Sequence, residues 1–250
     1  MTDKLICEDL DGVLLMTLNR PERLNAVDKE LETAFVAKLE EAKRDDNTRA
    51  VVVAGAGDRA FCAGYDVHEM STWPEDQFRT EQMRQTWAWW AIASFPKPLV
   101  TANHHQTLGW GAITSVSADI RIGCDLTEWQ FTASPHGGAN LTWNLPPLIG
   151  WSKTKEYLMT SCRVSAQEAK EVGLLNRLVD RDEVLPEALR VAQQMASYPP
   201  AGVMTIKRLI SEAQGRDQLS QLRAEADAAQ AMFVQTGNLV ASEYEEFIKK

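Results

Sequence analysis

The chain has 250 residues, of which 44% are hydrophobic, and a net charge of −9 from 26 basic and 35 acidic residues. This length and composition suit one sizeable globular core. The acidic balance, with no basic cluster, argues against a nucleic-acid or anionic-membrane surface. No stretch approaches the ~18 apolar residues of a membrane span, and the N-terminal segment lacks the layout of a signal peptide. We therefore expect a cytoplasmic protein.

The first 55 residues predict two strands, a helix and a third strand. Residues 5–7 and 13–18 are typical of a hairpin around an Asp-Gly turn. Apolar residues then recur at helical spacing over 31–42, with Asp28 as a candidate N-cap. The apolar, β-branched run at 50–55 predicts a fully buried strand.

Residues 61–70, with the sequence Phe-Cys-Ala-Gly-Tyr-Asp-Val-His-Glu-Met, follow this strand and are the most informative stretch. Ligands of α/β proteins gather beyond the carboxyl ends of strands, where backbone N–H groups point outward. The main chain at Ala63, Gly64 and Tyr65 is therefore a candidate for hydrogen bonding to a ligand. The alternative is a glycine-containing turn that only leads the strand into a helix.

Further strands and helices follow. Residues 97–102 predict a strand, and residues 75–95 predict a helix. The segments at 165–168 and 180–183 have the pattern of capping boxes that open helices. Gly173 suits the end of the first of these helices, and the Pro-Pro pair at 199–200 suits the end of the second.

Cysteines and histidines give no indication of a metal centre. The four cysteines are widely spaced and form no C-x-x-C pair, which favours reduced thiols. The four histidines show no H-x₃-H spacing and no acidic companion at helical distance. We expect no bound metal and no permanently bound cofactor.

Several segments resemble the crotonase (enoyl-CoA hydratase/isomerase) superfamily. Residues 61–70 match its Phe-x-Ala-Gly-x-Asp-Ile-x-Glu-Met motif, residues 19–26 match Asn-Arg-Pro-x-x-x-Asn-Ala, and residues 163–176 match its Ile-Ser-Ala-x-Glu-Ala segment and the Gly-Leu-Val-Asn that follows. The resemblance implies an α/β fold: a crotonase-like ββα spiral core with an acyl-CoA site over 1–195. A C-terminal α-helical trimerisation region over 196–250 would belong to the same catalytic unit. The expected assembly is a homotrimer or a hexamer.

The resemblance also implies site residues. Two backbone N–H groups, those of Tyr65 and Trp110, would hold the thioester oxygen of an acyl-CoA substrate. Coenzyme A would enter as part of the substrate, and the residues expected to border it are Arg23, Leu24, Ala63, Tyr65, Asp66 and Val67. The Arg23 side chain could bind a phosphate, or it could simply be exposed in a turn.

This chain departs from the family pattern where hydratases carry their acid and base. Trp110 replaces the middle glycine of a Gly-rich turn, although its amide is retained and a helix should still begin there. Ile113 stands where one hydratase glutamate is expected, and Pro135 or His136 stands where the other is expected. His136 is the best replacement acid or base because an imidazole titrates near neutral pH. It could equally cap the following turn.

Other candidates have weaker roles. His104 and His105, which replace an Asn-Gly pair of the family, could be structural or lie near the acyl tail. Asp66 belongs to the main-chain turn at 63–65.

The helix at 75–95 is rich in aromatic residues. Trp87, Trp90 and Phe95 cannot all face solvent without a cost of a few kcal/mol, so some must pack in a core or trimer interface or line an acyl pocket.

The predicted function is an enzyme of enoyl-CoA hydratase/isomerase type that stabilises a thioester enolate. A C–C bond hydrolase, a decarboxylase or a lyase of the same fold is an alternative. An alternative of another class is a non-catalytic acyl-CoA-binding protein.

Overall fold

The computed structural model describes residues 2–213 together with positions 215, 217, 220, 222–224 and 227–228. The chain divides into two compact units, Met1–Ser197 and Tyr198–Lys250. In the second unit, helix α8 (Pro200–Glu212) is described. Most of the predicted trimerisation region beyond α8 therefore lies outside the described residues.

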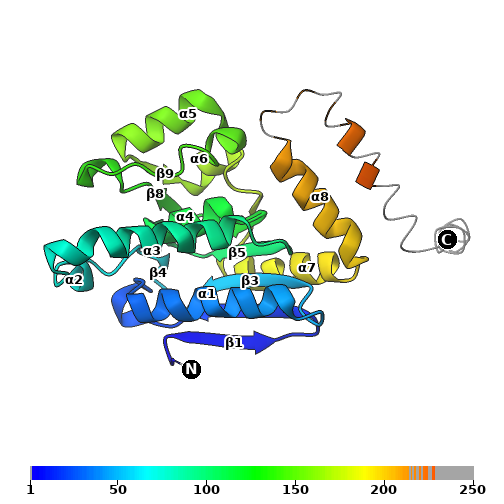
Figure 1. The fold of residues 1–250 in the computed structure, drawn as a ribbon, viewed down its shortest axis with the longest axis horizontal. Helices are drawn as coiled ribbons and strands as arrows, with labels where there is room; N and C mark the ends of the chain where they lie inside the picture. The colour runs from blue at the N-terminus through cyan, green and yellow to red at the C-terminus, as the bar shows by residue number, and fades with distance from the viewer. Residues whose placement is uncertain are drawn as a thin grey trace, which may run out of the picture. The chain divides into compact units, whose positions relative to one another are not determined.

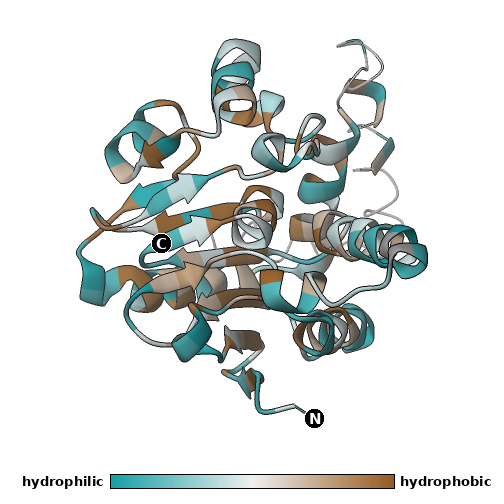
Figure 2. Ribbon diagram, turned by 90° about the vertical axis from the view of Figure 1, so that its left-hand side faces the viewer, coloured by the Kyte–Doolittle hydropathy of each residue, from teal (hydrophilic) through white to brown (hydrophobic). Residues whose placement is uncertain are grey.

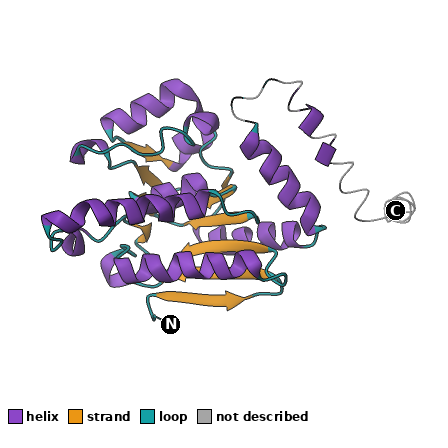
Figure 3. Cartoon of the chain, in the orientation of Figure 1, coloured by secondary structure: helices purple, strands orange, loops and turns teal. Residues whose placement is uncertain are grey.

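Two β-sheets form the centre of the first unit (Figures 1 and 3). The six-stranded sheet has the order β1-β2-β3-β5-β7-β10, and the four-stranded sheet has the order β4-β6-β8-β9. All neighbouring strands are parallel except for the β1–β2 and β8–β9 pairs. The strands are β1 (Leu5–Asp9), β2 (Val13–Leu18), β3 (Ala50–Gly55), β4 (Ala60–Cys62), β5 (Leu99–Asn103), β6 (Gln106–Leu108), β7 (Ile120–Gly123), β8 (Glu128–Gln130), β9 (Arg163–Ser165) and β10 (Arg177–Leu178).

From β3 to β8, successive strands alternate between the two sheets, which produces repeated ββα units. β3 leads into β4, β5 into β6 and β7 into β8, and a helix follows each pair. The predicted ββα core is therefore confirmed. The helices of this unit are α1 (Lys29–Arg44), α2 (Val67–Met70), α3 (Glu75–Ala93), α4 (Trp110–Ser117), α5 (Pro146–Thr160), α6 (Ala166–Glu171) and α7 (Val184–Ala196). In the described part of the chain, no helix combines the length and apolarity needed to cross a membrane.

Helices cover both faces of the six-stranded sheet. On β3, Val51 and Val53 belong to a buried cluster with Phe35 of α1, whereas Val52 belongs to another with Ala188 of α7. This alternation follows from the two-residue period of a strand. Figure 2 shows the hydrophobic colouring concentrated on these central strands. Burial on both faces explains why β3 is an uninterrupted apolar run.

The predicted helix caps had mixed outcomes. Asp28 accepts a hydrogen bond from the backbone N–H of Leu31 at 2.9 Å, and Ser165 accepts one from that of Glu168 at 3.2 Å, so both caps are confirmed. The predicted capping box at Asp180 is wrong, because this side chain makes no cap hydrogen bond. A short 3₁₀ helix over 181–183 intervenes between Asp180 and α7, so Asp180 does not stand at the start of α7.

The tryptophan-rich helix is present as α3, and it packs only in part. Phe95, just beyond its end, is buried, and Trp89 packs against two core clusters. Trp87 and Trp90 remain 65% and 54% exposed in the single chain. Of the three side chains that could not all face solvent, Phe95 is therefore the one that packs in the core of the single chain.

Candidate active site

Two turns from different ββα units touch at a pair of glycines. β4 and β6 pair in parallel, so the turns that follow them leave the same edge of the smaller sheet. Gly64 has φ +108° and Gly109 has φ +48°, a left-handed region that favours glycine. A Cβ placed on Gly109 would lie 3.1 Å from the Cα of Gly64, and one placed on Gly64 would lie 3.6 Å from the amide nitrogen of Trp110. The backbones meet without an intervening side chain.

Each turn presents a main-chain N–H group with no partner among the described residues. These two groups belong to Tyr65 and Trp110, whereas the adjacent N–H groups of Asp66 and Gly109 donate to backbone carbonyls at 2.9 and 3.3 Å. Trp110 is the first residue of α4, as predicted, so no intrahelical acceptor is available to its N–H. The partial positive charge of the helix N-terminus adds to the field there.

The side chains of the same two residues turn into the core. The Trp110 indole is fully buried and packs edge-on against Phe35, with ring centroids 5.1 Å apart. Its Nε1 donates to the carboxylate of Glu32 at 3.1 Å, and the Tyr65 hydroxyl donates to the same carboxylate at 2.6 Å. The bulky residue in the place of a glycine therefore fills the core beneath α1.

A pocket of about 340 Å³ lies against the first turn. It brings together all six residues that were predicted to border coenzyme A, namely Arg23, Leu24, Ala63, Tyr65, Asp66 and Val67, and adds Glu22, Ala26, Arg59 and His68. The exposed guanidinium groups of Arg23 and Arg59 give the pocket two positive charges in an otherwise acidic protein. Such groups suit phosphate oxygens.

Asp66 lines this pocket but is occupied by structural bonds. It is the N-cap of α2, accepting from the backbone N–H of His68 at 3.1 Å, and it pairs with Arg20 at 3.0 Å. Burial would raise the pKa of Asp66, but its bonds to Arg20 and to backbone N–H groups outweigh burial and lower the pKa. Asp66 is therefore held as a carboxylate that fixes the turn.

The predicted acid or base, His136, is not brought to this pocket. It lies on a 3₁₀ turn, Ser134–His136, and its side chain is exposed. Ile113 is buried in an apolar cluster with Phe131 and Trp129, which is not a setting for a carboxylate. Burial lowers the pKa of His104, which stays outside the described lining of the pocket. His105 is also outside that lining, and its Nδ1 accepts from the backbone N–H of Gln106.

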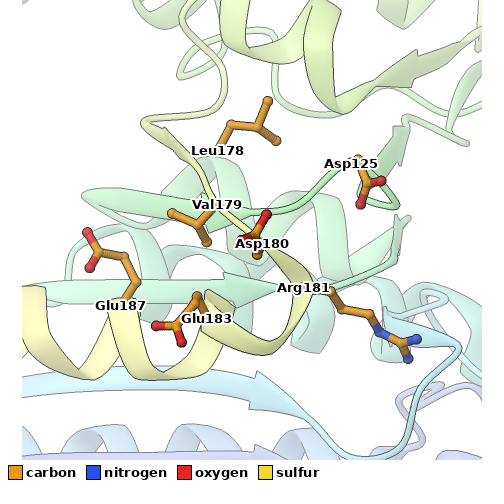
Figure 4. Close-up of a pocket in the computed structure, with 7 residues that line it drawn as sticks. All are labelled: Asp125, Leu178, Val179, Asp180, Arg181, Glu183 and Glu187. Atoms are coloured by element: carbon orange, nitrogen blue, oxygen red, sulfur yellow. The ribbon is translucent and has the colours of Figure 1, made fainter.

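A second, larger pocket of about 800 Å³ is less suitable for a phosphate-bearing ligand (Figure 4). Four carboxylates line it, those of Asp125, Asp180, Glu183 and Glu187. Its one basic lining residue, Arg181, points away from Glu183 and Glu187 and pairs with Asp58 at 3.2 Å. This pocket would repel phosphates.

Sequence reasoning missed Glu32 and Arg59. Glu32 lies one residue from Leu31 and three from Phe35, on the buried face of α1. A carboxylate at that position in the helical pattern was the available signal, because charged residues are rarely buried without a role or a partner. Arg59 belongs to the turn between β3 and β4, and its place beyond a strand's carboxyl end was the corresponding signal.

Comparison with known proteins agrees with this architecture. Residues 8–245 match the family model described as enoyl-CoA hydratase/isomerase. The chain is 29% identical to a 1,2-epoxyphenylacetyl-CoA isomerase of Escherichia coli over 86% of this chain and 85% of that protein. It is 27% identical to a short-chain-enoyl-CoA hydratase of Clostridium acetobutylicum over 90% and 88% of the two chains.

Solved structures show the same likeness. The crystal structure of an enoyl-CoA hydratase from Bacillus anthracis superimposes with a TM-score of 0.91 and 28% identity, covering 99% of this chain and 96% of that one. The match therefore extends over the sheets, the two turns and the helices around them. On the family model and these relatives together, the chain belongs to the enoyl-CoA hydratase/isomerase family of the crotonase superfamily.

Proposed function

We propose that this protein is an enzyme that binds an acyl-CoA thioester and stabilises its enolate with the main-chain N–H groups of Tyr65 and Trp110. The observation that carries the proposal is that these two N–H groups have no hydrogen-bond partner within the described part of the chain and stand on turns that touch at Gly64 and Gly109. Fixed, unpaired donors of this kind are what a developing oxyanion requires.

The chemistry follows from where charge develops. When a bond to the thioester Cα breaks and leaves its electron pair behind, negative charge moves onto the carbonyl oxygen. Two N–H donors already in position stabilise this charge without reorganisation, and one such donor is worth about 10²–10³ in kcat. The N-terminus of α4, at Trp110, contributes a favourable dipole.

The pocket beside the first turn is the proposed binding site for the coenzyme A moiety. Arg23 and Arg59 would bind its phosphates, and the main chain around Leu24 and Ala63 would border it. The relatives named above act on CoA thioesters according to their names, which supports this substrate class. On the same likeness we propose a homotrimer or hexamer, which analytical ultracentrifugation tests.

The surroundings of Ile113 and His136 bear on the reaction type. Hydration by two carboxylates requires an acid and a base near the acyl Cα and Cβ. Ile113 is buried among apolar side chains and His136 is exposed. Isomerisation, decarboxylation and C–C bond cleavage all pass through a thioester enolate, so the same pair of N–H groups would serve each of them.

A non-catalytic acyl-CoA-binding protein is the second candidate. This candidate is favoured by the small number of carboxylates beside the pocket. Within its described lining, the only carboxylates are those of Glu22 and the ion-paired Asp66. Saturable binding of acyl-CoA, with no turnover of any enoyl-, β-ketoacyl- or malonyl-type thioester, would support this candidate and exclude the enzyme.

The direct test replaces one N–H group by an ester oxygen. Incorporating the α-hydroxy acid analogue of tryptophan at position 110 removes the donor and keeps the side chain. We expect turnover of the best thioester to fall about 10²–10³-fold with affinity for coenzyme A retained. The matched control is the same change at Ala201, whose N–H lies in the first turn of α8. Equal turnover in both ester variants would contradict the proposal.

A further inference from the structure

Glu32 is a buried carboxylate for which the mechanism above provides no direct role. It lies on the core-facing side of α1, and its side chain has no exposed surface. Its neighbours on this face, Leu31 and Phe35, are apolar and buried. Placing a charge there is costly unless it is paired and hydrogen-bonded, so its partners show what the group does.

Three side chains donate to this carboxylate. One oxygen, Oε1, accepts from the Tyr65 hydroxyl at 2.6 Å and from the Trp110 indole N–H at 3.1 Å. The other oxygen, Oε2, accepts from Arg84 of α3. The Tyr65 hydroxyl accepts in turn from the indole N–H of Trp89 at 2.6 Å. Three donors therefore hold the two carboxylate oxygens, which is an arrangement that suits an ionised group.

The same carboxylate oxygen thus holds the side chains of both residues whose main-chain N–H groups form the proposed oxyanion hole. Tyr65 and Trp110 belong to different ββα units and are 45 positions apart in the chain. Apart from the glycine contact between their turns, this shared acceptor is a direct link between the two residues. Both side chains bond to the same atom, Oε1 of Glu32, so a displacement of Tyr65 or Trp110 would lengthen its hydrogen bond to that atom.

We propose that Glu32 is a positioning residue: by holding the side chains of Tyr65 and Trp110 in the core, it sets the spacing of their main-chain N–H groups. This inference rests on the proposed function of that N–H pair and adds the group that orients it. Glu32 does not touch the substrate, because the rings of Tyr65 and Trp110 lie between it and their backbones.

The electrostatics of the network agree with this role. Burial raises the pKa of Glu32, while the donors from Tyr65, Arg84 and Trp110 oppose that rise. Burial would lower the pKa of Arg84, but its bonds to Glu81 and Glu32 outweigh burial and raise it. Burial, followed by the nearby Glu32 carboxylate, raises the pKa of the Tyr65 hydroxyl, so this phenol remains a donor.

The test compares substitutions that remove or retain the acceptor. Glu32→Leu removes it at similar size, and Glu32→Gln retains one carbonyl oxygen that can still accept from Tyr65 and Trp110. The readout is the infrared stretch of an isotope-labelled thioester carbonyl in bound acyl-CoA, because hydrogen bonds from an oxyanion hole lower its frequency. Affinity is measured separately by calorimetry, since the coenzyme A pocket does not include Glu32.

We expect Glu32→Leu to lose most of the frequency shift and to lower kcat by about 10²-fold with little change in KM, because small misplacements of catalytic donors have effects of this size. Glu32→Gln should retain part of the frequency shift and part of the wild-type kcat. The matched control is Glu168→Leu, because Glu168 also accepts from a tyrosine hydroxyl and a cationic side chain, those of Tyr157 and Lys153. This control should keep the wild-type shift.

Each remaining outcome decides the proposal. If Glu32→Leu keeps the wild-type frequency and kcat, Glu32 is only a core group, and the oxyanion hole stands without it. If the wild-type complex itself shows no frequency shift, the proposed function fails and this inference fails with it. Should Glu32→Leu not fold, Tyr65→Phe and Trp110→Phe each remove one bond to Glu32, and an unchanged shift in both would overturn the proposal.

Discussion

Gly109 packs directly against Gly64, so closely that a Cβ on Gly109 would lie 3.1 Å from the Cα of Gly64. This contact joins the two turns that carry the unpaired N–H groups. Both glycines have positive φ, which other L-residues adopt only with strain. The relation between the turns therefore depends on the absence of two side chains.

Gly109→Ala should separate the turns. We expect a loss of about 1–3 kcal/mol of stability from the strained φ, together with a fall in kcat because the donors move apart. The control is Gly150→Ala, since Gly150 also has positive φ but no atom within 4 Å of its would-be Cβ. Thermal unfolding and steady-state kinetics would show a stability loss in both variants and a kcat loss only in Gly109→Ala. A kcat loss of the same size in both would contradict the role of the contact.

Arg23→Ala and Arg59→Ala should weaken acyl-CoA binding. Both residues line the pocket beside the first turn, and neither touches the N–H pair, so KM should rise while kcat is largely kept. The effect should shrink as ionic strength increases, because exposed charges are screened by salt. Arg163→Ala is the control, as this surface arginine pairs with Glu128 on the smaller sheet. An unchanged KM in both pocket variants would place the phosphates elsewhere.

Asp66→Ala should destabilise the first turn. It removes the cap of α2 and leaves Arg20 with one fewer carboxylate partner, for an expected loss of about 1–3 kcal/mol in a denaturant titration. Asp66→Asn keeps an oxygen for the backbone N–H of His68 and should lose less. Equal losses in the two variants would show that the ion pair with Arg20, rather than the cap, dominates.

Glu187 should contribute to acid unfolding. Its bonds to Arg190 and Arg177 lower its pKa from 4.5 to about 2 in the folded protein. Between these two values the unfolded chain binds more protons than the folded chain, so stability falls as pH falls. The stabilisation from Glu187 is fully present when the pH is above its pKa in the unfolded chain. It is lost as the pH falls through its pKa in the folded protein. Urea titrations across this range should show a shallower pH dependence for Glu187→Gln than for the wild type, and identical slopes would refute the assignment.

Much of the fold was predictable because it depends on local chemistry. The Asp28 and Ser165 caps and the buried strand β3 each follow from residues within a few positions of one another, whereas the start of α4 at Trp110 was expected from the family resemblance. The wrong prediction at Asp180 has a local cause as well. A capping-box pattern does not reveal that a 3₁₀ turn stands between Asp180 and the helix.

The less predictable part of the site depends on long-range contacts. The direction of the Trp110 side chain is set by Glu32, 78 positions away, and no spacing rule connects the two. Arg59 joins Arg23 at one pocket because β2 and β3 pair in parallel, so that the segments following these two strands leave the same edge of the sheet. His136 has the right chemistry for an acid or base in its sequence context, but its exposed 3₁₀ turn is a tertiary feature.

The most direct test of the proposed oxyanion hole is a crystal structure of the protein with a non-hydrolysable acyl-CoA analogue. We expect a carbonyl oxygen about 2.7–3.1 Å from the amide nitrogens of both Tyr65 and Trp110, the distance range of oxyanion-hole donors. An analogue bound at full occupancy with its carbonyl oxygen contacting neither nitrogen would contradict it.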